Sequence, residues 1–513
     1  MKPFTRIKKI HGYEYAYEIT PYYDKESKRI RQHSKYLGKY EDGKIKRVSY
    51  TLPVSAYDYG ELLPFLKIGE DLKLNEILQT ILPEDATHTV IALAINRIVS
   101  PVSLDNLKTW YDRTHLSNLY GSLSLSSQSI SNLLRKLGES NINVDFSSRF
   151  VKSLKLEKKE ALMYDITSLS SYSKLIDILE YGYNRDGLDL PQLNLFLIAH
   201  KTLGIPIFYD VYPGSIVDVS TLHNTIERLR SLGIVEISLI MDRGFFSDGN
   251  LADLKESGYD FIVPASFSNK RVKSMVLEMK KEIERGKNLT KFNGHVIFVM
   301  STLVDIGEYT YQAYVYYDPQ RESGERVRLY DRLHSIAERL GNRKLRKWEN
   351  PSKVFGEIAG KYSSYLDWKT IDHEYTVNVK DKAVSQRVNR MGFTVILYRG
   401  EYDWKEVLTW YREKDIIEKM FMVMKKDLEI APLRAHKTEV AKGLIFVNFI
   451  ALIMRFRLLQ LMKKTDLTEK YSIPKLILEL SKIRRISLQD GSFITSEISK
   501  KQKDIIKKLE LDV

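Results

Sequence analysis

The chain has 513 residues, enough for roughly two to four domains and at least one substantial hydrophobic core. Its 80 Lys and Arg against 66 Asp and Glu give a formal charge of +14, which favours a polyanionic partner, nucleic acid before an anionic membrane surface. A composition of 43% hydrophobic and 28% charged residues excludes the disordered and fibrous classes. The absence of cysteine excludes disulfides, thiolate zinc sites and a cysteine nucleophile.

The N-terminal segment is strongly basic. Residues 1–50 carry 13 Lys/Arg and 6 Asp/Glu, and 13 − 6 = +7 is half of the excess charge of the chain. The alternation in YEYAYEI, followed by TPYYDKESKRIRQ, predicts a β-hairpin with a basic turn. Its interleaved tyrosines and basic residues suit either contact with a phosphate backbone or an ordinary solvated hairpin. The segment has no apolar run of signal-peptide length, so we expect a cytoplasmic protein.

Several short helices are predicted over residues 61–150. DATHTVIALAINRIVSP has apolar residues three and four apart and stops at Pro101, while SSQSISNLLRKLGES opens with capping serines and closes at Gly138. Short helices of this kind suit a helix-turn-helix-like DNA-binding region, although small helical domains have many other roles.

The apolar pattern changes to that of strands from residue 160. ALMYDIT, LNLFLIAH and IPIFYDVYPG predict three strands, the last two joined by a tight turn at KTLG. A helix over 219–233, the strand EISLIM, a helix over 248–258 and the strand YDFIVPA follow. This order predicts an α/β sheet with helices packed on it.

A β-rich insertion is predicted over residues 270–395, where β-branched and aromatic residues such as those of GHVIFVMSTLVDIGEYTYQAYVYYDP interrupt the alternation. The α/β pattern resumes at FTVILYRG, before a long helix that begins near Asp403. The apolar stretch GLIFVNFIALIM, about a dozen residues, is too short for a bilayer that needs roughly 20 and predicts a buried helix.

Two of the predicted strands carry an aspartate. Asp165 lies within the first strand, in MYDITSLSS, and Asp242 ends the strand EISLIM. Each can be read as a turn residue, since Asp favours turns and Ser247 can cap the next helix. Together they favour a shared divalent cation, because adjacent strands lie roughly 5 Å apart and an apolar strand tolerates a charge only with compensation.

A third polar feature lies on the helix predicted within residues 410–428. At about 100° per residue, an apolar stripe made of Ile416, Ile417, Met420, Phe421 and Met424 should face the core. The opposite side carries Tyr411, Lys414, Glu418 and Lys425. Such a stripe is also typical of an ordinary solvated face with ion pairs.

The three features in this order resemble the DDE transposases of prokaryotic insertion sequences. The spacing Tyr411, Lys414, Glu418, Lys425 resembles the subgroup with a Tyr-Arg-Glu-Lys signature and a β-rich insertion before the Glu. In this chain Lys414 stands at the Arg position, which keeps the charge but loses the bidentate fork suited to phosphate. Arg412 and Arg243 lie nearby in the sequence.

The resemblance implies a ribonuclease-H-like mixed sheet flanked by helices, in which Asp165, Asp242 and Glu418 hold two Mg²⁺ ions, replaceable by Mn²⁺. It implies cleavage of element ends and joining of 3′-hydroxyls to target DNA, with Tyr411, Lys414, Lys425 and Arg243 as DNA contacts. The partners would be double-stranded DNA and further copies of the chain, with no membrane. The implied division is a basic hairpin arm (1–60), a helical DNA-binding region (61–150), the first part of the catalytic core (151–269), the β-rich insertion (270–395), the second part of the core (396–465) and a C-terminal helical tail (466–513).

Two other functions stay open at this point. The first is a metal-dependent nuclease on the same core that does not join strands, and the second is a DNA-binding protein that no longer cleaves. The histidines His200, His223 and His436 lack the spacing of a zinc site and are expected to be core or surface residues.

Overall fold

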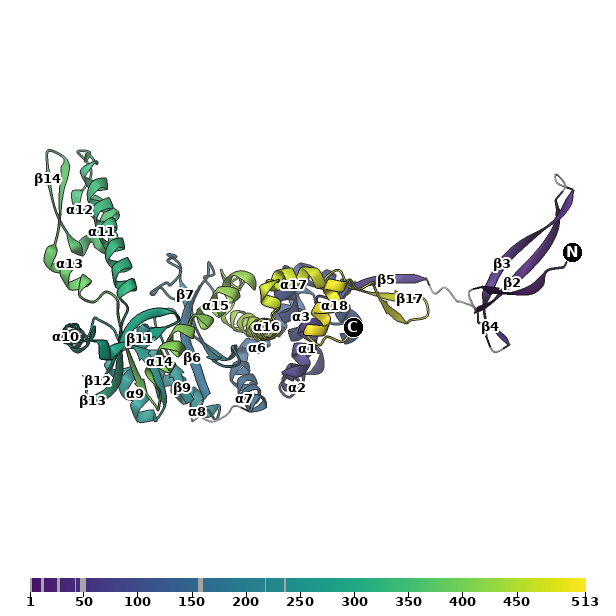
Figure 1. Cartoon of the computed structure of the whole chain (residues 1–513), viewed down its shortest axis with the longest axis horizontal. Helices are drawn as coiled ribbons and strands as arrows, with labels where there is room; N and C mark the ends of the chain where they lie inside the picture. The colour runs from purple at the N-terminus through teal and green to yellow at the C-terminus, as the bar shows by residue number, and fades with distance from the viewer. Residues whose placement is uncertain are drawn as a thin grey trace.

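The computed structural model describes residues 2–10, 13–24, 28–41, 43–46, 52–155, 160–216, 218–234 and 237–513. The molecule is elongated, with a small N-terminal sheet at one end and a unit of helices with a β-hairpin at the other (Figure 1). The predicted mixed α/β class, with a large mixed sheet and many helices, is confirmed.

The central sheet has nine strands in the order β11-β12-β13-β16-β10-β9-β6-β7-β8. Five of them occupy the part of the chain where three strands and then alternating helices were predicted: β6 (Glu160–Ser170), β7 (Gln192–His200), β8 (Ile205–Pro213), β9 (Ile237–Ile240) and β10 (Asp260–Pro264). β6, β7 and β8 pair antiparallel, whereas β6, β9 and β10 run parallel. All nine residues of β7 are buried, as expected of a strand covered on both faces.

The helices α8 (Asp218–Ser231) and α9 (Asp248–Ser257) provide the crossovers between the parallel strands. The Ser247 hydroxyl accepts a hydrogen bond from the Asn250 amide at 3.2 Å and caps α9, as its sequence predicts. Gly258, with φ +81°, ends the same helix in the left-handed conformation. The residue Glu236, predicted as the start of β9, lies outside the described residues.

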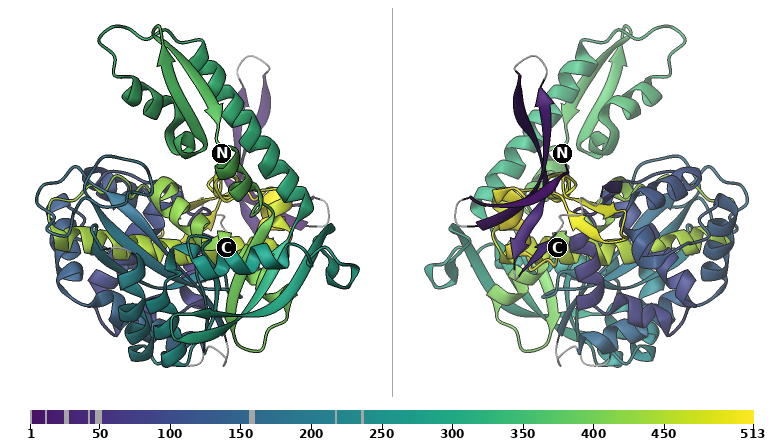
Figure 2. Two further views of the ribbon diagram at one scale, coloured as in Figure 1. Left: turned by 90° about the vertical axis from the view of Figure 1, so that its left-hand side faces the viewer. Right: turned by 90° about the vertical axis from the view of Figure 1, so that its right-hand side faces the viewer.

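Residues 270–395 differ from the single β-rich insertion expected there. After α10 (Lys270–Met279), the strands β11 (Leu289–Phe292), β12 (His295–Ile306) and β13 (Tyr309–Tyr317) extend the central sheet, which they join through the pairing of β13 with β16 (Phe393–Arg399). The rest forms a separate unit with its own buried cluster, made of α11 (Pro319–Gly341), α12 (Pro351–Ala359), β14 (Leu366–Ile371), β15 (Glu374–Val379) and α13 (Asp381–Val388). Figure 2 shows this unit rising from the central sheet.

The helical region is built around one long C-terminal helix, α16 (Thr438–Lys464). It packs against α1 (Leu63–Asp71), α3 (Glu84–Val99), α6 (Ser127–Glu139) and also β8, so it joins the helical region to the sheet. The other helices here are α2 (Leu74–Gln79), α4 (Leu107–Arg113), α5 (Leu116–Tyr120) and α7 (Ile142–Leu154). By length and composition α16 could cross a membrane, but 72% of its apolar window is buried inside the protein, as in a core helix.

The C-terminal residues form more than the predicted helical tail. Besides α17 (Ile473–Leu480) and α18 (Lys500–Lys508), they contribute β17 (Arg484–Leu488) and β18 (Phe493–Thr495). β17 pairs with β5 (Pro53–Asp58), so strands from the two ends of the chain share one sheet. The separate N-terminal sheet contains β1 (Phe4–Ile10), β2 (Tyr13–Asp24), β3 (Arg29–Glu41) and β4 (Lys44–Lys46); the middle of the basic turn, residues 25–27, lies outside the described residues.

Helices α6 and α16 approach each other closely through two glycines. A Cβ on Gly443 would overlap the backbone carbonyl of Leu134, and one on Gly138 would overlap that of Glu439. The two backbones therefore pack with no room for a side chain between them.

Replacing Gly443 should consequently separate α6 from α16. We expect Gly443→Ala to lower the free energy of unfolding by about 1–3 kcal/mol, the usual range for overpacking a tight core. Denaturant unfolding would measure the change. The control is Gly356→Ala in α12, where a Cβ meets no atom within 4 Å and helix propensity predicts a gain of up to about 1 kcal/mol. Equal changes in both variants would contradict the role of this crossing.

Candidate active site

The register of two parallel strands brings Asp165 and Asp242 to the same level of the central sheet. Met163 on β6 pairs with Ile240 on β9. Asp165 lies two residues beyond Met163, and Asp242 lies two residues beyond Ile240. Because side chains alternate along strands with a period of two, the aspartates are expected on one face, as neighbours.

The segment that carries Glu418 forms three helical pieces and not the long helix that its sequence suggested. α14 (Trp404–Glu413) ends before Lys414, α15 (Asp415–Met422) follows, and a π-helical turn covers Val423–Asp427. α15 packs against β6 and β7 through its apolar side, where Ile417, Met420 and Phe421 are buried. This packing places Glu418 near the two aspartates.

The three carboxylates surround the ammonium group of Lys414. Its Nζ lies 3.3 Å from Glu418 Oε1, 3.5 Å from Asp165 Oδ2 and 3.7 Å from Asp242 Oδ1. The Lys414 side chain is only 5% exposed, whereas Asp242 and Glu418 are 47% and 62% exposed. Lys414 therefore lies beneath the carboxylates, on the protein side, and not on the solvated face that helical periodicity indicated.

Burial and charge determine the protonation of this cluster. Burial raises the pKa of Asp165 to about 6, although Lys414 and the Ile166 amide, which donates to Oδ1 at 2.9 Å, oppose the shift. Burial by itself would lower the pKa of Lys414, but the three surrounding carboxylates stabilise its charged form more strongly, so the pKa is raised. By formal charge, the three carboxylates and one ammonium sum to −3 + 1 = −2, so the cluster attracts cations.

The donor chemistry fits a divalent cation. Carboxylate oxygens are the hard ligands that Mg²⁺ and Mn²⁺ prefer. In the arrangement seen, no group of three or more His, Asp or Glu side chains among the described residues is disposed to hold a metal ion. Lys414 is the cation around which Asp165, Asp242 and Glu418 converge, so metal binding requires these side chains to adjust.

The remaining predicted contacts lie around this cluster. Arg243 is exposed in the short turn η2 (Arg243–Phe245) directly after Asp242, and Tyr411 is half-buried in the last turn of α14. Lys425 lies in the π-helical turn and forms an ion pair with Asp186, at 2.7 Å and 2.8 Å to the two carboxylate oxygens. Asp186 belongs to the connection between β6 and β7, and nothing in its local sequence indicates this contact.

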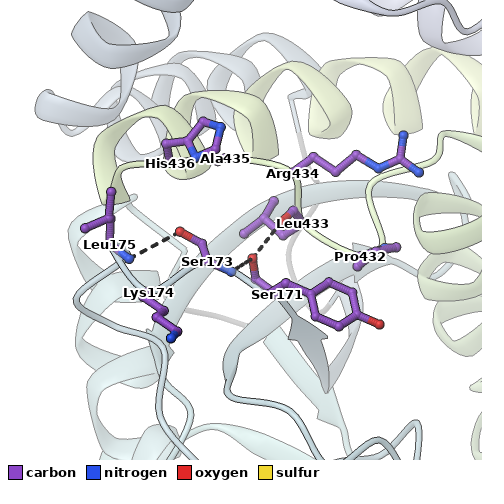
Figure 3. A pocket seen from close by; sticks show the side chains of 10 residues that line it. Ser171, Ser173, Lys174, Leu175, Pro432, Leu433, Arg434, Ala435 and His436 are labelled. Atoms are coloured by element: carbon purple, nitrogen blue, oxygen red, sulfur yellow. Dashed lines mark hydrogen bonds between the residues drawn. The ribbon is translucent and has the colours of Figure 1, made fainter.

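The histidines take the places expected of core and surface residues. His200 is buried and accepts a hydrogen bond from the Leu203 amide at 3.0 Å. His223 is exposed and lies 3.5 Å from Asp253. His436 is exposed and lines a pocket of about 650 Å³ between residues 171–175 and 432–436 (Figure 3). The three carboxylates do not line this pocket, which also carries Lys174 and Arg434.

Comparison with known proteins identifies the family of this arrangement. Residues 158–454, more than half of the chain, match the family described as transposase DDE domain. No curated protein matches the chain. Among solved structures, the piggyBac transposase synaptic complex with hairpin DNA is similar with a TM-score of 0.39 and 11% identity, over 82% of this chain and 79% of that one. The Drosophila P element transposase strand transfer complex is similar with a TM-score of 0.20 and 13% identity, over 74% and 80% of the two chains.

Removing the central ammonium should destabilise the metal-free protein. Rupture of a buried ion pair costs about 3–5 kcal/mol, and water screens part of this cost at Asp242 and Glu418, so we expect Lys414→Met to lose about 1–3 kcal/mol. Denaturant unfolding in a chelating buffer would measure the loss. Lys419→Met, which removes an exposed pair with Asp415 on the same helix, should stay within about 0.5 kcal/mol of the native protein. A Lys414→Met variant as stable as this control would show that the cluster does not need the ammonium.

Proposed function

Because the chain belongs to the family of DDE transposases, we propose that Asp165, Asp242 and Glu418 are the catalytic acids with which it cleaves the ends of an insertion element and joins the 3′-hydroxyl ends to target DNA. The observation that carries this proposal is the convergence of the three carboxylates, from β6, the end of β9 and α15, on one buried cation. Phosphoryl transfer of this type needs no covalent enzyme intermediate, so the three acids require no nucleophilic side chain beside them.

The carboxylates would hold two Mg²⁺ ions, or Mn²⁺ in their place. When bound, such ions supply Lewis-acid activation of the attacking oxygen and stabilise the leaving oxygen. Asp165 and Asp242 are fixed by the sheet, whereas Glu418 is carried on a helix that packs on it. The buried ammonium of Lys414 keeps the negative side chains together before a metal arrives.

The strand order supports a ribonuclease-H-like core. β6, β7 and β8 form an antiparallel meander in which β6 is an outer strand. β9 pairs with the free side of β6 in parallel, and β10 pairs with β9 in parallel. Asp165 lies on the first of these strands, β6, and Asp242 follows the fourth, β9. The spacing Tyr411, Lys414, Glu418, Lys425 supports assignment to the prokaryotic subgroup with the Tyr-Arg-Glu-Lys signature.

We assign the positioning of DNA to basic and aromatic side chains around the acids. Lys425 and Arg243 would contact phosphates, and Tyr411 would lie along the same strand. Lys414 is buried among carboxylates, so it would reach a phosphate only after leaving them. The helices of residues 61–150 would bind the element ends as double-stranded DNA, and the basic N-terminal arm (1–60) would add phosphate contacts, in a complex of several copies of the chain in the cytoplasm.

Each acid should be essential for cleavage and dispensable for binding. Replacing a residue that only hydrogen-bonds to a metal ligand lowers metal affinity or activity about 10–100-fold. Replacing a ligand itself, in Asp165→Asn, Asp242→Asn or Glu418→Gln, should therefore lower the rate of cleavage by more than about 100-fold. Nicking and joining of DNA duplexes taken from either side of the gene, with Mg²⁺, would measure it. Asp415→Asn, an exposed acid on the same helix, is the control and should retain activity.

The outcomes of this assay separate the possible functions. Cleavage and joining, both lost in the acid variants, would establish the proposed reaction. Cleavage without joining would indicate a nuclease on the same core. Binding without cleavage by the native protein would contradict the catalytic proposal and leave a DNA-binding protein.

The pair Lys425–Asp186 gives an independent test of DNA contact. If Lys425 neutralises a phosphate, Lys425→Gln should weaken duplex binding and reduce the salt slope of log affinity by about 1. Asp186→Asn should strengthen binding, because Lys425 would no longer be held by a competing carboxylate. Lys426→Gln, the exposed neighbour, is the matched control, and a salt slope equal in both lysine variants would refute a specific contact at Lys425.

A further inference from the structure

The N-terminal sheet, β1 to β4, has two very different faces. Cross-strand partners share a face, and β1 pairs with β2 from Phe4↔Ile19 to Ile10↔Tyr13, while β2 pairs with β3 through Tyr17↔Tyr36 and Tyr23↔Ile30. Alternation along these strands therefore puts six aromatic rings on one side. We call this side the tyrosine face, after Phe4, Tyr13, Tyr15, Tyr17, Tyr23 and Tyr36.

The same face carries most of the positive charge of the sheet. Among the described residues of the four strands it has one acid, Glu41, and five basic side chains: Arg6, Lys8, Lys39, Lys44 and Lys46. The opposite face has three acids, Glu14, Glu18 and Asp24, and four basic residues, Lys9, Arg29, Arg31 and Lys35. The net charges are thus 5 − 1 = +4 on the tyrosine face and 4 − 3 = +1 on the other.

Rings and cations on the tyrosine face are interleaved. Lys39 lies 4.3 Å from the centre of the Tyr13 ring, Lys8 lies 4.9 Å from Tyr17, and Arg6 lies 5.4 Å from Phe4. Tyr36 contacts both Tyr15 and Tyr17, with ring centres 6.1 Å and 5.4 Å apart. The result is a cluster of three rings, Tyr15, Tyr17 and Tyr36, among further rings and basic side chains on the same face.

This surface is open to solvent. Phe4, Tyr13 and Tyr23 are 43%, 56% and 57% exposed, and Figure 1 shows the sheet at the end of the molecule, apart from the helical region. Exposed rings on a flat sheet are well suited to stack against a flat partner such as a nucleic-acid base. In a DNA duplex the base faces are already stacked on one another, so a duplex would use the charges of this face and leave its rings without stacking partners.

We propose that the tyrosine face binds an unpaired DNA strand, with bases stacked on its rings and phosphates on its basic side chains. Aromatic platforms on four-stranded sheets and positively charged aromatic grooves bind unpaired nucleic acid by the same chemistry. The inference goes beyond the proposed cleavage and joining, because this surface contains none of the three acids. It adds a second nucleic-acid site, of different specificity, to the chain.

Binding of fluorescent DNA to the full-length protein tests the proposal. The probes are a 20-nucleotide single strand and its duplex at one salt concentration, in a chelating buffer so that the result is independent of cleavage. We expect Tyr13→Ala and Tyr23→Ala each to raise the dissociation constant for the single strand by at least about fivefold, and that for the duplex by less than about twofold. Tyr13→Phe, which keeps the ring, should bind the single strand as the native protein does.

The opposite face supplies the matched control. Tyr22 lies next to Tyr23 on β2, points to the other side of the sheet and is 47% exposed, so Tyr22→Ala should leave both affinities unchanged. An equal loss in Tyr22→Ala and Tyr23→Ala would overturn the proposal, as would a loss of duplex binding as large as that of single-strand binding. Lys8→Gln should lower the affinity for the single strand and for the duplex, because both carry phosphates.

Discussion

The proposed active site of this transposase depends on the compensation of like charges. Three carboxylates from separate parts of the chain converge at a distance where their mutual repulsion would oppose folding, and the ammonium of Lys414, buried under them, offsets that repulsion. The compensation is incomplete, since one positive charge faces three negative ones. The site is therefore assembled and still attractive to cations, a combination that an apolar or fully neutralised cluster could not provide.

The sequence predicted the parts of this site that follow from periodicity and order. Asp165 and Asp242 were expected on two strands of one sheet because the apolar runs beside them have strand length. Two further strands and a helix lie between these runs in the chain, so the direct pairing of β6 with β9 depends on tertiary structure. The apolar stripe of residues 416–424 placed Glu418 on a helix packed against the sheet. Helical periodicity put Lys414 on one side with Glu418, and their contact at 3.3 Å agrees with it, but the burial of Lys414 depends on the two aspartates of the sheet, which no local pattern indicates. The contact of Lys425 with Asp186 depends on tertiary packing and has no local signal.

The fold shows the same division between local and distant information. Strands β6 to β10 were predicted in order because each carries its own apolar pattern. By contrast, β12 and β13 have the composition of an independent β-rich unit and yet extend the central sheet, since partner choice depends on β16, about 80 residues later in the chain. Likewise, β17 was not predicted as a strand at all, because its pairing with β5 joins segments more than 400 residues apart.

The pairing of the chain ends has a consequence for synthesis of the protein. The helices of residues 63–154 leave the ribosome early, but α1, α3 and α6 among them pack against α16, and β5 has its partner only when β17 emerges. Contacts between residues so far apart in the sequence form late, because closing a very long loop costs conformational entropy. The helical region must therefore stay incompletely buried until α16 and β17 have been translated, whereas the first strands of the central sheet pair over short distances. Emergence of α16 and β17, and not of the early helices themselves, is the event that allows this region to close.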